Sequence, residues 1–486
     1  MRAPVFRRQL LKKVTHRKAG ITVFGLGAVG LQVALAFSRA GFNSIGVDTD
    51  SEKVNALSAG LAPGHEEKTA RLMAKFFRKR RFQATSDLTL SASCSDFVVL
   101  CLPTPLTSDN LPDLRFLVDT CAKLSSQDLR NKCIILESSV YPGVTRKILK
   151  PALELGRYVA GVDFGLAHSP ERVDTNNRDF PLARIPKLVG GIDKASTDVA
   201  CALYAVVLKA PVIRVASAEI AEAAKMLENT YRFVNICMMN EVASAFESMG
   251  VDTFDVVKAA STKPFGFMPH YPGPGVGGHC IPKDPFYLMK AAKEVGKSLT
   301  IVEAAVHVNK RIPIEIVSRI DGALGIVGKS INGARVALLG LAYKRNVDDT
   351  RRSSAFAILS ELQKHGAVVR VYDPVALVRK SELHGIEQCR SLEQAIRDAD
   401  VIFLHTDHDI FHKLNLAKIR GSLARDPILF DARNFWDTPK AKRKGYLYRG
   451  IGKRAADDNS ELLAAKPRSS AASSEQRNTV RDSSNA

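Results

Sequence analysis

The sequence predicts an α/β protein in which two Rossmann-like, doubly wound domains are joined by a central all-helical domain with a long connecting helix. Two observations predict the α/β halves. Short apolar runs alternate with amphipathic runs over residues 20–215, and the same alternation resumes over residues 328–452. A third observation predicts the middle, since residues 216–249 form one long run rich in Ala, Met, Leu and Glu, which are strong helix formers.

Shifts in composition give the domain boundaries. A chain of 486 residues is too long for one core, so we expect a first domain at 20–215, a central domain at 216–327 and a second α/β domain at 328–452. Residues 1–19 are strongly basic, and residues 453–486 are mainly Ser, Ala and Arg without periodicity. We expect both of these segments to be disordered.

Composition also excludes several classes of protein. The formal net charge is +20, but seven cations in residues 1–18 supply +7 of it, and no nucleic-acid-binding motif accompanies the basic runs. We therefore expect an anionic small molecule, and no nucleic acid, as the partner. No window of about 18 apolar residues predicts membrane insertion. The eight cysteines form no C-x-x-C pair, so we expect no metal site and a reduced, cytoplasmic setting.

A glycine motif follows the first predicted strand. The run Gly25-Leu26-Gly27-Ala28-Val29-Gly30 is a G-x-G-x-x-G motif between a strand and a helical pattern. Gly25 permits a tight turn, Gly27 lets a pyrophosphate approach the backbone, and Gly30 lets the helix pack on the strand. Asp48 ends the next strand, where a carboxylate bonds ribose hydroxyls and repels a 2′-phosphate. The motif therefore predicts NAD rather than NADP.

Three further loops follow predicted strands of the first half: Pro103-Thr104-Pro105, Glu137-Ser138-Ser139 and Ser169-Pro170-Glu171-Arg172. For any one of them, ordinary loop structure is as good an interpretation as function. However, the carboxyl ends of parallel strands meet at one edge of a sheet, and ligands of doubly wound sheets bind at that edge. Because three such loops converge there, we expect them to form a floor for cofactor and substrate.

One cysteine ends the most glycine-rich run of the chain. Residues 273–284 read G-P-G-V-G-G-H-C-I-P-K-D, which predicts a rigid loop that a ligand approaches closely. An isolated cysteine is more often a buried apolar residue than a nucleophile. Here His279, Lys283 and Asp284 surround Cys280 with groups that favour a thiolate or handle a proton, so we expect a nucleophile.

The long central run carries two polar residues on one face. Lys225 and Asn229 are four positions apart, which places them side by side on a helix. On an exposed helix such a pair is usually only solvated. On a helix that leads toward the cysteine loop, it is a candidate for holding an oxyanion or a water molecule.

The second α/β half has no G-x-G-x-x-G motif, so we expect no second dinucleotide there. Its first strand is followed by Gly340-Leu341-Ala342-Tyr343-Lys344 and then by Arg351. These cations and backbone amides are of the kind that bind a nucleotide diphosphate.

Taken together, residues 20–450 resemble the UDP-glucose/GDP-mannose dehydrogenase family. The most specific element of the resemblance is G-V-G-G-H-C-I-P-K-D, supported by S-P-E-R, by A-E-A-A-K-M-L-E-N-T around Lys225 and by G-L-A-Y-K. The run K-P-F-G-F-M-P from Lys263 and the run E-S-S-V-Y-P-G from Glu137 resemble the branch that oxidises UDP-N-acetylglucosamine. Lys283 resembles the UDP-glucose branch instead, and Ser139 stands where the family usually has threonine.

The resemblance implies a four-electron oxidation of the C6 alcohol of a UDP-sugar to a carboxylate, with two NAD consumed. Cys280 would capture the aldehyde as a thiohemiacetal, and a second oxidation would give a thioester that water hydrolyses. The catalytic residues implied are Cys280, Lys225, Asn229, Asp284, Glu171 and Ser139. The cofactor contacts implied are Gly25, Gly27, Val29, Gly30, Asp48, Pro103, Thr104, Ser139 and Lys283. The substrate contacts implied are Glu171, Arg172, Lys225, Asn229, Lys263, Tyr271, Gly275, Gly277, Lys344 and Arg351.

Several alternatives stay open from the sequence. UDP-N-acetylglucosamine is the expected substrate, and UDP-N-acetylmannosamine and UDP-glucose are the alternatives within the family. Outside the family, a two-electron β-hydroxyacid dehydrogenase has a similar first half but needs neither Cys280 nor a third domain. A protein that only binds NAD, as a sensor or scaffold, is the non-enzyme alternative. We also expect a homodimer, because the long helices of the central domain offer an interface.

Overall fold

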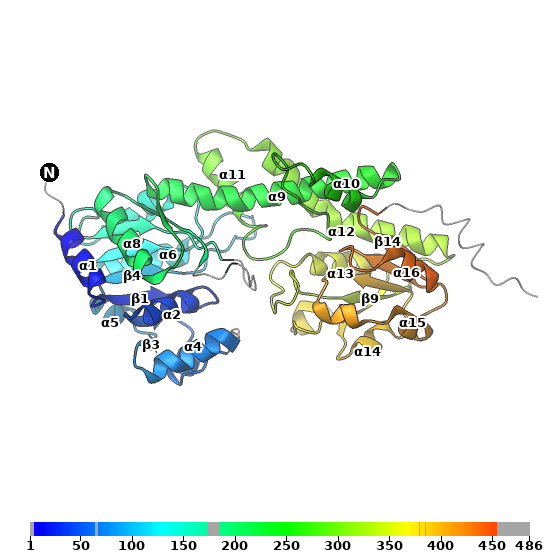
Figure 1. The fold of residues 1–486 in the computed structure, drawn as a ribbon, viewed down its shortest axis with the longest axis horizontal. Helices are drawn as coiled ribbons and strands as arrows, with labels where there is room; N and C mark the ends of the chain where they lie inside the picture. The colour runs from blue at the N-terminus through cyan, green and yellow to red at the C-terminus, as the bar shows by residue number, and fades with distance from the viewer. Residues whose placement is uncertain are drawn as a thin grey trace, which may run out of the picture.

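The computed structural model describes residues 4–63, 67–173, 180, 184–378, 380–383 and 385–453. Two α/β bodies lie at opposite ends of the molecule, and the long helices of the central region run along one side and join them (Figure 1). The predicted fold class is therefore confirmed. Residues 454–486, which hold nearly all of the predicted disordered tail, lie outside the described residues.

The first body is built on an eight-stranded sheet of order β3-β2-β1-β4-β5-β6-β7-β8. Helices cover it because its central strands are apolar on both faces, as in β4 and β5, where every residue is buried. The strands are β1 (Gly20–Phe24), β2 (Asn43–Val47), β3 (Phe82–Thr85), β4 (Phe97–Leu100), β5 (Cys133–Leu136), β6 (Gly165–His168), β7 (Lys187–Gly191) and β8 (Val212–Arg214). The helices are α1 (Val5–Thr15), α2 (Gly30–Ala40), α3 (Ser51–Ser58), α4 (Glu67–Arg78), α5 (Leu88–Ser93), α6 (Arg115–Ser125), η1 (Thr145–Leu149), α7 (Lys150–Leu153) and α8 (Lys194–Val207).

The sequence predicted a wholly parallel first sheet, and this prediction is wrong at one place. β6 and β7 pair antiparallel, while the other pairs in this sheet are parallel. A parallel pair needs a crossover connection, usually a helix. The sequence between these strands, which includes Glu171 and Arg172, shows no helical periodicity, so the chain turns back instead.

The sequence also predicted a disordered extension at residues 1–19, and this prediction is wrong for helix α1. Phe6, Leu10 and Val14 recur at every fourth position and are 0–2% exposed in the core of the first body. Arg7 forms an ion pair with Asp198 of α8, with 2.8 Å between Nε and Oδ2. Spacing of four gives a helix one apolar face, so the cations lie on the other faces.

The central region consists of α9 (Ala218–Ser248), α10 (Thr253–Ala260), α11 (Asp284–Glu294) and α12 (Thr300–Ile326). Helix α9 leaves the first body and reaches the second (Figure 1). Its 31 residues correspond to a rod of about 46 Å at 1.5 Å per residue. Packing of α9 against α11 and α12 makes the predicted all-helical domain.

The second body has a six-stranded sheet of order β11-β10-β9-β12-β13-β14, in which all pairs are parallel. The strands are β9 (Arg335–Leu339), β10 (Val368–Tyr372), β11 (Glu387–Gln388), β12 (Val401–Leu404), β13 (Ile428–Asp431) and β14 (Leu447–Gly450). The helices are α13 (Ser354–Lys364), η3 (Lys380–Leu383), α14 (Leu392–Ile396), η4 (Asp409–Lys413), α15 (Leu416–Ile419), η5 (Arg420–Ser422) and α16 (Thr438–Arg443). Both bodies place the central strand, β1 or β9, between neighbours that come later in the chain, as doubly wound sheets do.

Candidate active site

The glycine motif forms the turn between β1 and α2. Gly25 has a φ of +88°, and a Cβ there would lie 2.6 Å from the carbonyl oxygen of Cys101. A Cβ at Gly30 would lie 1.8 Å from the carbonyl oxygen of Gly25, so both positions exclude a side chain. A Cβ at Gly27 would meet nothing within 4 Å, and this open space lies at the N-terminal end of α2. The turn therefore fits the diphosphate of a dinucleotide, and Val29, 36% exposed, borders it.

Asp48 follows β2 beside this turn. Its Oδ2 accepts the backbone N–H of Leu26 at 2.8 Å and the Lys53 ammonium at 3.0 Å, and its Oδ1 accepts the N–H of Asp50 at 3.1 Å. Burial acts to raise the pKa of Asp48, but these donors outweigh burial and lower the pKa overall. The carboxylate is therefore ionised and fixed at the place where the ribose of NAD binds in this fold.

The loop after β4 joins the first body to the cysteine loop. Lys283 donates from Nζ to the carbonyl oxygen of Thr104 at 3.0 Å and to its Oγ1 at 3.2 Å. The Tyr287 hydroxyl donates to the same carbonyl at 2.8 Å, and Thr104 Oγ1 donates to the carbonyl of Ser139 at 2.9 Å. Lys283 is 2% exposed, and its ammonium lies 4.5 Å from the centre of the Tyr287 ring. Two of the three predicted strand-end loops, those with Pro103 and Ser139, therefore meet at the cysteine loop.

Helix α9 holds both ends of the cysteine loop. Asn240 Oδ1 accepts the N–H of Gly273 at 2.8 Å, and Asn229 Nδ2 donates to Oδ2 of Asp284 at 2.6 Å. Asn229 and Asn240 are eleven positions apart, which is about three helical turns, so they share one face of the helix. Lys225, four positions before Asn229, is buried on the same side. The predicted pair of Lys225 and Asn229 is thus buried beside the loop.

The glycines of this loop allow it to lie against the second body. Gly278 has a φ of +99°, and a Cβ there would lie 2.8 Å from Cε2 of Tyr343. A Cβ at Gly277 would lie 3.0 Å from Cβ of Tyr343 and 3.0 Å from the carbonyl oxygen of Arg352. Gly275 has a φ of +100° and lies beside Ser354. The loop therefore runs between the two α/β bodies, in contact with both.

The thiol of Cys280 lies among ionisable groups. Its Sγ is 3.6 Å from Nδ1 of His279. The sequence suggested that its neighbours favour a thiolate, but burial and the charge of Asp284 raise the pKa of Cys280, and the charges of Lys225, Lys283 and Arg351 only partly oppose this. Burial, Lys283 and Arg351 lower the pKa of His279 to about 4, so His279 is neutral near pH 7. The resting site therefore pairs a thiol with a neutral imidazole.

Asp284 is the most deeply buried acid at the site. It begins α11, is 0% exposed, and its N–H bonds the carbonyl oxygen of Cys280 at 2.9 Å. Oδ2 accepts from Asn229, while Oδ1 lies 3.6 Å from the Lys283 ammonium and has no hydrogen-bond partner among the described residues. A buried oxygen of this kind is a position for a bound water molecule.

The second body contributes cations to the site. Arg351 forms a bidentate ion pair with Asp349, with Nε–Oδ1 at 2.9 Å and Nη2–Oδ2 at 2.6 Å. The charge of Arg351 acts to lower the pKa of Cys280. Lys344 is half-buried on the loop after β9, close in sequence to Tyr343, which packs on the cysteine loop. The predicted diphosphate-binding segment therefore lies on the side of the second body that faces Cys280.

Glu171 lies in a buried ionic cluster that the sequence did not reveal. Its Oε1 accepts the N–H groups of Arg172 at 2.7 Å and Val173 at 2.6 Å, and its Oε2 accepts the Lys187 ammonium at 3.2 Å. The same ammonium donates to Glu137 Oε2 at 2.9 Å. Burial acts to raise the pKa of Glu171, but Lys187 and the backbone donors outweigh burial and lower it. Glu171 is therefore held as a carboxylate with both oxygens engaged.

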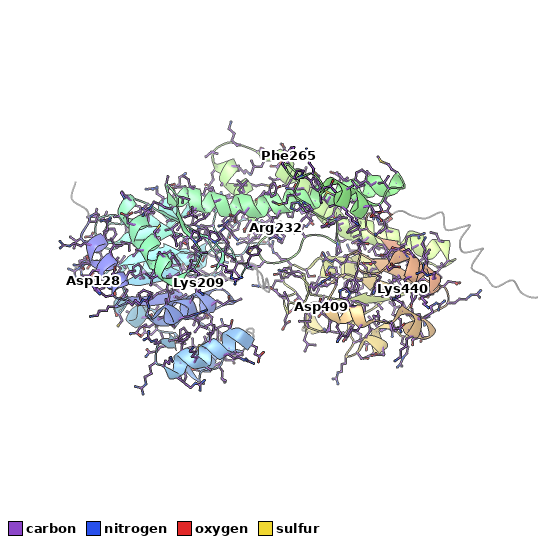
Figure 2. All side chains as sticks on the ribbon, in the orientation of Figure 1. Asp128, Lys209, Arg232, Phe265, Asp409 and Lys440 are labelled. Carbon is purple, nitrogen blue, oxygen red and sulfur yellow. The ribbon has the colours of Figure 1, made fainter. Side chains whose placement is uncertain are left out.

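Some of the predicted substrate-binding residues do not lie around Cys280 in the structure. Arg172 pairs with Glu228 of α9 at 2.6 Å. Lys263 lies 4.9 Å from the ring centre of exposed Phe265, on the outer side of the helical region (Figure 2). Tyr271 is 50% exposed and stacks on Phe254 at 5.8 Å. Within the described part of this chain, Lys263 and Tyr271 are on the surface rather than in the cluster around Cys280.

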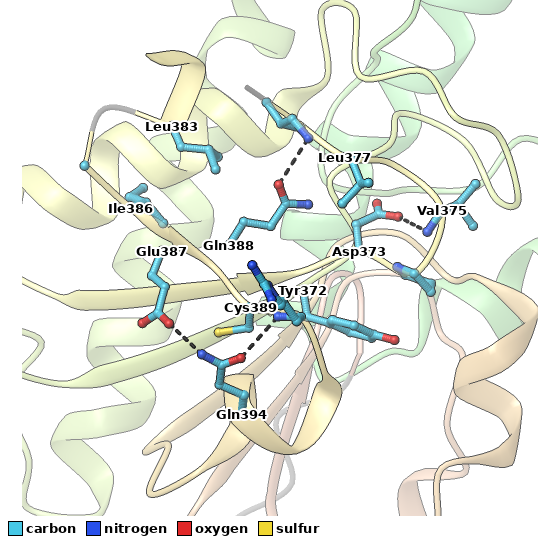
Figure 3. A pocket seen from close by; sticks show the side chains of 14 residues that line it. Tyr372, Asp373, Val375, Leu377, Leu383, Ile386, Glu387, Gln388, Cys389 and Gln394 are labelled. Atoms are coloured by element: carbon cyan, nitrogen blue, oxygen red, sulfur yellow. Dashed lines mark hydrogen bonds between the residues drawn. The ribbon is translucent and has the colours of Figure 1, made fainter. Parts of the chain in front are cut away.

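A hollow lies at the β10–β11 edge of the second body, with a volume of about 920 Å³ (Figure 3). Its polar groups bond one another. Gln388 accepts the N–H of Val378 at 3.1 Å and donates to the carbonyl of Ala376 at 2.9 Å, and Gln394 donates to Glu387 at 2.7 Å. This hollow therefore offers mainly its apolar wall to a ligand, and it does not contain the cysteine loop.

No group of three or more His, Cys, Asp or Glu in the described ranges is placed to hold a metal ion. All eight cysteines are free thiols. Among the helices that the structure describes, none combines the length and apolar character that a membrane crossing requires.

Comparison with known families identifies the three parts of the chain. Models of the UDP-glucose/GDP-mannose dehydrogenase family match its NAD-binding domain at residues 19–208, its central domain at 219–311 and its UDP-binding domain at 337–438. The chain belongs to this family. It is therefore an NAD-dependent dehydrogenase with a domain that binds the UDP part of a nucleotide sugar.

Two curated relatives and one solved structure show how far the similarity of this dehydrogenase extends. A UDP-N-acetyl-D-mannosamine dehydrogenase of Pyrococcus horikoshii is 33% identical over 433 residues, which cover 89% of this chain and 99% of that protein. A UDP-N-acetyl-D-glucosamine 6-dehydrogenase of Pseudomonas aeruginosa is 31% identical over 423 residues, covering 87% of this chain and 98% of that protein. The solved structure of the Pyrococcus horikoshii UDP-D-ManNAc dehydrogenase superimposes with a TM-score of 0.82 at 31% identity, covering 90% of this chain and 100% of that one.

Proposed function

We propose that this dehydrogenase oxidises the C6 hydroxyl of UDP-N-acetylglucosamine to a carboxylate in two NAD-dependent steps. The observation that carries the proposal is the position of Cys280, on a loop that contacts both α/β bodies and whose ends are held by Asn229 and Asn240. A thiol placed between a dinucleotide turn and a UDP-binding body is where the sugar end of a UDP-sugar meets the cofactor.

The chain's own residues supply the covalent chemistry. When NAD is bound, it accepts a hydride in each oxidation. After the first oxidation, the Cys280 thiol adds to the aldehyde carbon, and its proton leaves to solvent. After the second oxidation, the resulting thioester is attacked by water near Asp284, which releases the carboxylate and restores the thiol. Overall, one alcohol, two NAD⁺ and one water give one carboxylate, two NADH and three protons.

Lys225 and Asn229 support the charged stages of this reaction. Each oxyanion that forms at C6 needs a donor in a site shielded from water. Lys225 and Asn229 are 7% and 6% exposed, so a donor there acts in a medium of low polarity. We propose that Lys225 stabilises the oxyanion, that Asn229 and Asp284 orient the water, and that Ser139 contributes its hydroxyl from the neighbouring loop.

The choice of sugar rests on sequence runs and relatives. K-P-F-G-F-M-P favours the acetamido sugar, and both curated relatives described above act on UDP-N-acetyl sugars according to their names. Lys283 favours UDP-glucose, so UDP-N-acetylmannosamine and UDP-glucose are the competing substrates. The uronate product would serve the synthesis of surface polysaccharide in the cytoplasm, where the free thiols are kept reduced.

The deciding experiment measures NADH release from each of the three UDP-sugars by wild-type enzyme and by Cys280→Ser. We expect two NADH per molecule of UDP-N-acetylglucosamine for the wild type, and at least ~100-fold less acid product for Cys280→Ser, because a serine adduct does not give a reactive acyl intermediate. Cys237→Ser, a buried thiol on α9, is the control for general effects of thiol loss.

Three other results would each contradict the proposed reaction in a different way. One NADH per substrate would indicate a two-electron dehydrogenase, and NAD binding without any turnover would indicate a scaffold. Full acid production by Cys280→Ser would contradict the thioester route.

A further inference from the structure

A basic hollow of about 500 Å³ lies at the amino-terminal edge of the first sheet. Gly20 and Asn43, which begin β1 and β2, both line it. The five residues of β1 span about 17 Å and separate this hollow from the NAD turn, which starts at Gly25. Helix α1, whose end also lines the hollow, lies at the end of the first body that faces away from the second body (Figure 1). The hollow is therefore a different place from both the NAD turn and the cysteine loop.

Cations dominate the lining of this hollow. Among the described residues that line it, four cations and one carboxylate give a net charge of +3. These charged residues are Lys13, Arg17, Lys18, Asp96 and Lys132. Asp96 is already engaged, because its Oδ1 accepts the Lys13 ammonium at 2.5 Å and its Oδ2 accepts the N–H of Gly20 at 3.0 Å. The one acid of the lining is thus not free to neutralise the other cations.

Lys132 is the buried cation of the hollow, at 8% exposed. Its ammonium donates to the carbonyl oxygens of Ser93 at 3.2 Å and Ser95 at 2.5 Å, and no carboxylate of the described residues forms an ion pair with it. Burial lowers the pKa of Lys132, and the charges of Asp96 and Asp128 only partly oppose this. Because a buried charge without a counter-charge is unfavourable, an anion in the hollow would stabilise this ammonium.

Two helix ends account for part of the positive charge. Lys13 lies in the last turn of α1, and Lys132 bonds the carbonyl of Ser93, the last residue of α5. A helix C-terminus carries about half a negative elementary charge, so cations are common there. The two helix ends together therefore offset about one of the net positive charges of the lining. About two positive charges stay uncompensated.

A second arginine lies beside the hollow. A Cβ at Gly41 would lie 3.3 Å from Cδ of Arg17 and 3.4 Å from Nη1 of Arg81, so these two side chains approach the same glycine. Guanidinium groups match the oxygens of phosphate in geometry, and ammonium groups attract them as point charges. A single carboxylate on a ligand would leave positive charge unmatched, whereas a diphosphate brings enough negative charge to compensate it.

We propose that this hollow is a binding site for a free small molecule that carries a diphosphate or triphosphate group. Its volume lies within the range of about 300–1,000 Å³ that is typical of small-molecule sites. Lys132 is too deeply buried for a flat lipid surface to contact, which favours a solute over a membrane. Lys13, Arg17 and Lys18 all precede residue 19, where the match to the NAD-binding family model begins. The site therefore depends on an element of this chain outside that model, and it is independent of the proposed function.

Arg17 provides a variant that removes charge without harming the backbone. Its φ is +55°, in the left-handed region that favours glycine at the end of a helix. Arg17→Gly therefore removes one lining cation and keeps the turn after α1. Lys132→Met removes the buried cation. The matched control is Lys12→Met, which removes an exposed cation of α1 that does not line the hollow.

Cys94 provides a local readout, because it is exposed and lines the hollow. The rate of its alkylation by uncharged iodoacetamide can be followed by mass spectrometry of its peptide, at constant ionic strength and without turnover. With inorganic pyrophosphate as the probe, we expect the alkylation of wild-type Cys94 to slow in a saturable way. The half-maximal pyrophosphate concentration should rise by at least ~10-fold in Arg17→Gly and in Lys132→Met, as for the loss of a charge-assisted hydrogen bond. Lys12→Met should stay within ~2-fold of wild type.

Three results would overturn the proposal. Pyrophosphate would have no effect on the alkylation of Cys94, or the protection would persist at the wild-type concentration in both Arg17→Gly and Lys132→Met. In the third result, the protein would bind vesicles of phosphatidylglycerol and phosphatidylcholine while free pyrophosphate gives no protection, which would assign the basic surface to a lipid partner. Enzyme that turns over no UDP-sugar would defeat the proposed function but leave this readout intact.

Discussion

Asp48 and Asp373 occupy equivalent places after the second strand of each sheet, but their surroundings differ. Asp373 accepts the N–H groups of Leu341 and Ala342 on one oxygen and those of Val375 and Ala376 on the other. Burial acts to raise the pKa of Asp373, but His408 and these donors bring it to about 2. Its oxygens are thus occupied by its own domain. At the residue scale, the same acid is the expected ribose acceptor in one body and a structural cap in the other.

Asp48→Ser should shift the cofactor preference toward NADP. The substitution removes the charge that repels a 2′-phosphate, and it frees the Lys53 ammonium, now 3.0 Å from the Asp48 carboxylate, to pair with that phosphate. We expect the ratio of kcat/KM for NADP over NAD to rise by at least ~10-fold, equal to ~1.4 kcal/mol.

The matched control for this prediction is Asp50→Asn, which removes a neighbouring charge while keeping the cap of α3. An unchanged ratio in Asp48→Ser would show that Asp48 does not face the adenosine ribose.

Helix α1 shows how an element outside the family domains becomes part of the core. The NAD-binding family model begins at residue 19, after this helix, yet Phe6 and Leu10 are fully buried against the first body. Arg7 and Arg214 both pair with Asp198, which fixes the helix from its side. At the element scale, α1 is a structural addition to the NAD-binding domain.

Phe6→Ala should destabilise the first body. The loss of a buried ring with incomplete collapse of the cavity typically costs about 3–5 kcal/mol. We expect a clear fall in Tm and in the midpoint of urea unfolding, with the m-value retained. Arg8→Ala, on the exposed side of the same helix, should change stability by less than ~0.5 kcal/mol. Equal stability of Phe6→Ala and wild type would mean that α1 is detached in solution.

The sequence predicted local features well because their signals are local. A Cβ at Gly25 or Gly30 would clash with backbone, as the motif implied, and Cys280 lies on a tight loop between the two α/β bodies. Helix α1 was missed because seven cations concealed an apolar spacing of four. Lys187 was missed because its partners are 50 and 16 positions away, and nothing in one sequence shows that three strand ends share a buried charge.

The central region joins the two α/β bodies and exposes large apolar side chains. Helix α9 exposes Leu227, Tyr231 and Met238, which are 63%, 46% and 49% exposed and are spaced so that they share one side of the helix. Large apolar side chains gathered on one part of a surface are typical of an interface. This surface supports the expectation of a homodimer with the central helices at its centre.

Light scattering coupled to size exclusion should give a mass of twice 53.0 kDa for the wild type. Met238→Asp should shift the population toward the monomer, because a buried unpaired carboxylate opposes association. Leu377→Asp changes an even more exposed apolar residue, at 88%, on the second body and should leave the mass unchanged. A wild-type monomer, or a Met238→Asp dimer, would exclude this interface.

Asn229 and Asn240 hydrogen-bond to opposite ends of the cysteine loop. The distance between these two asparagines along α9 must therefore match the distance between the two ends of the loop. Inserting one residue between the two asparagines would rotate one of them about the helix axis by about 100° relative to the other and lengthen the distance between them by about 1.5 Å. The loop could then keep only one of its two anchors. Substitutions on the other faces of α9 leave the spacing of the two asparagines unchanged. An insertion or deletion between them that is not a whole number of turns would break one of the two hydrogen bonds that hold the cysteine loop. The interval of eleven positions is thus itself a structural requirement of the enzyme.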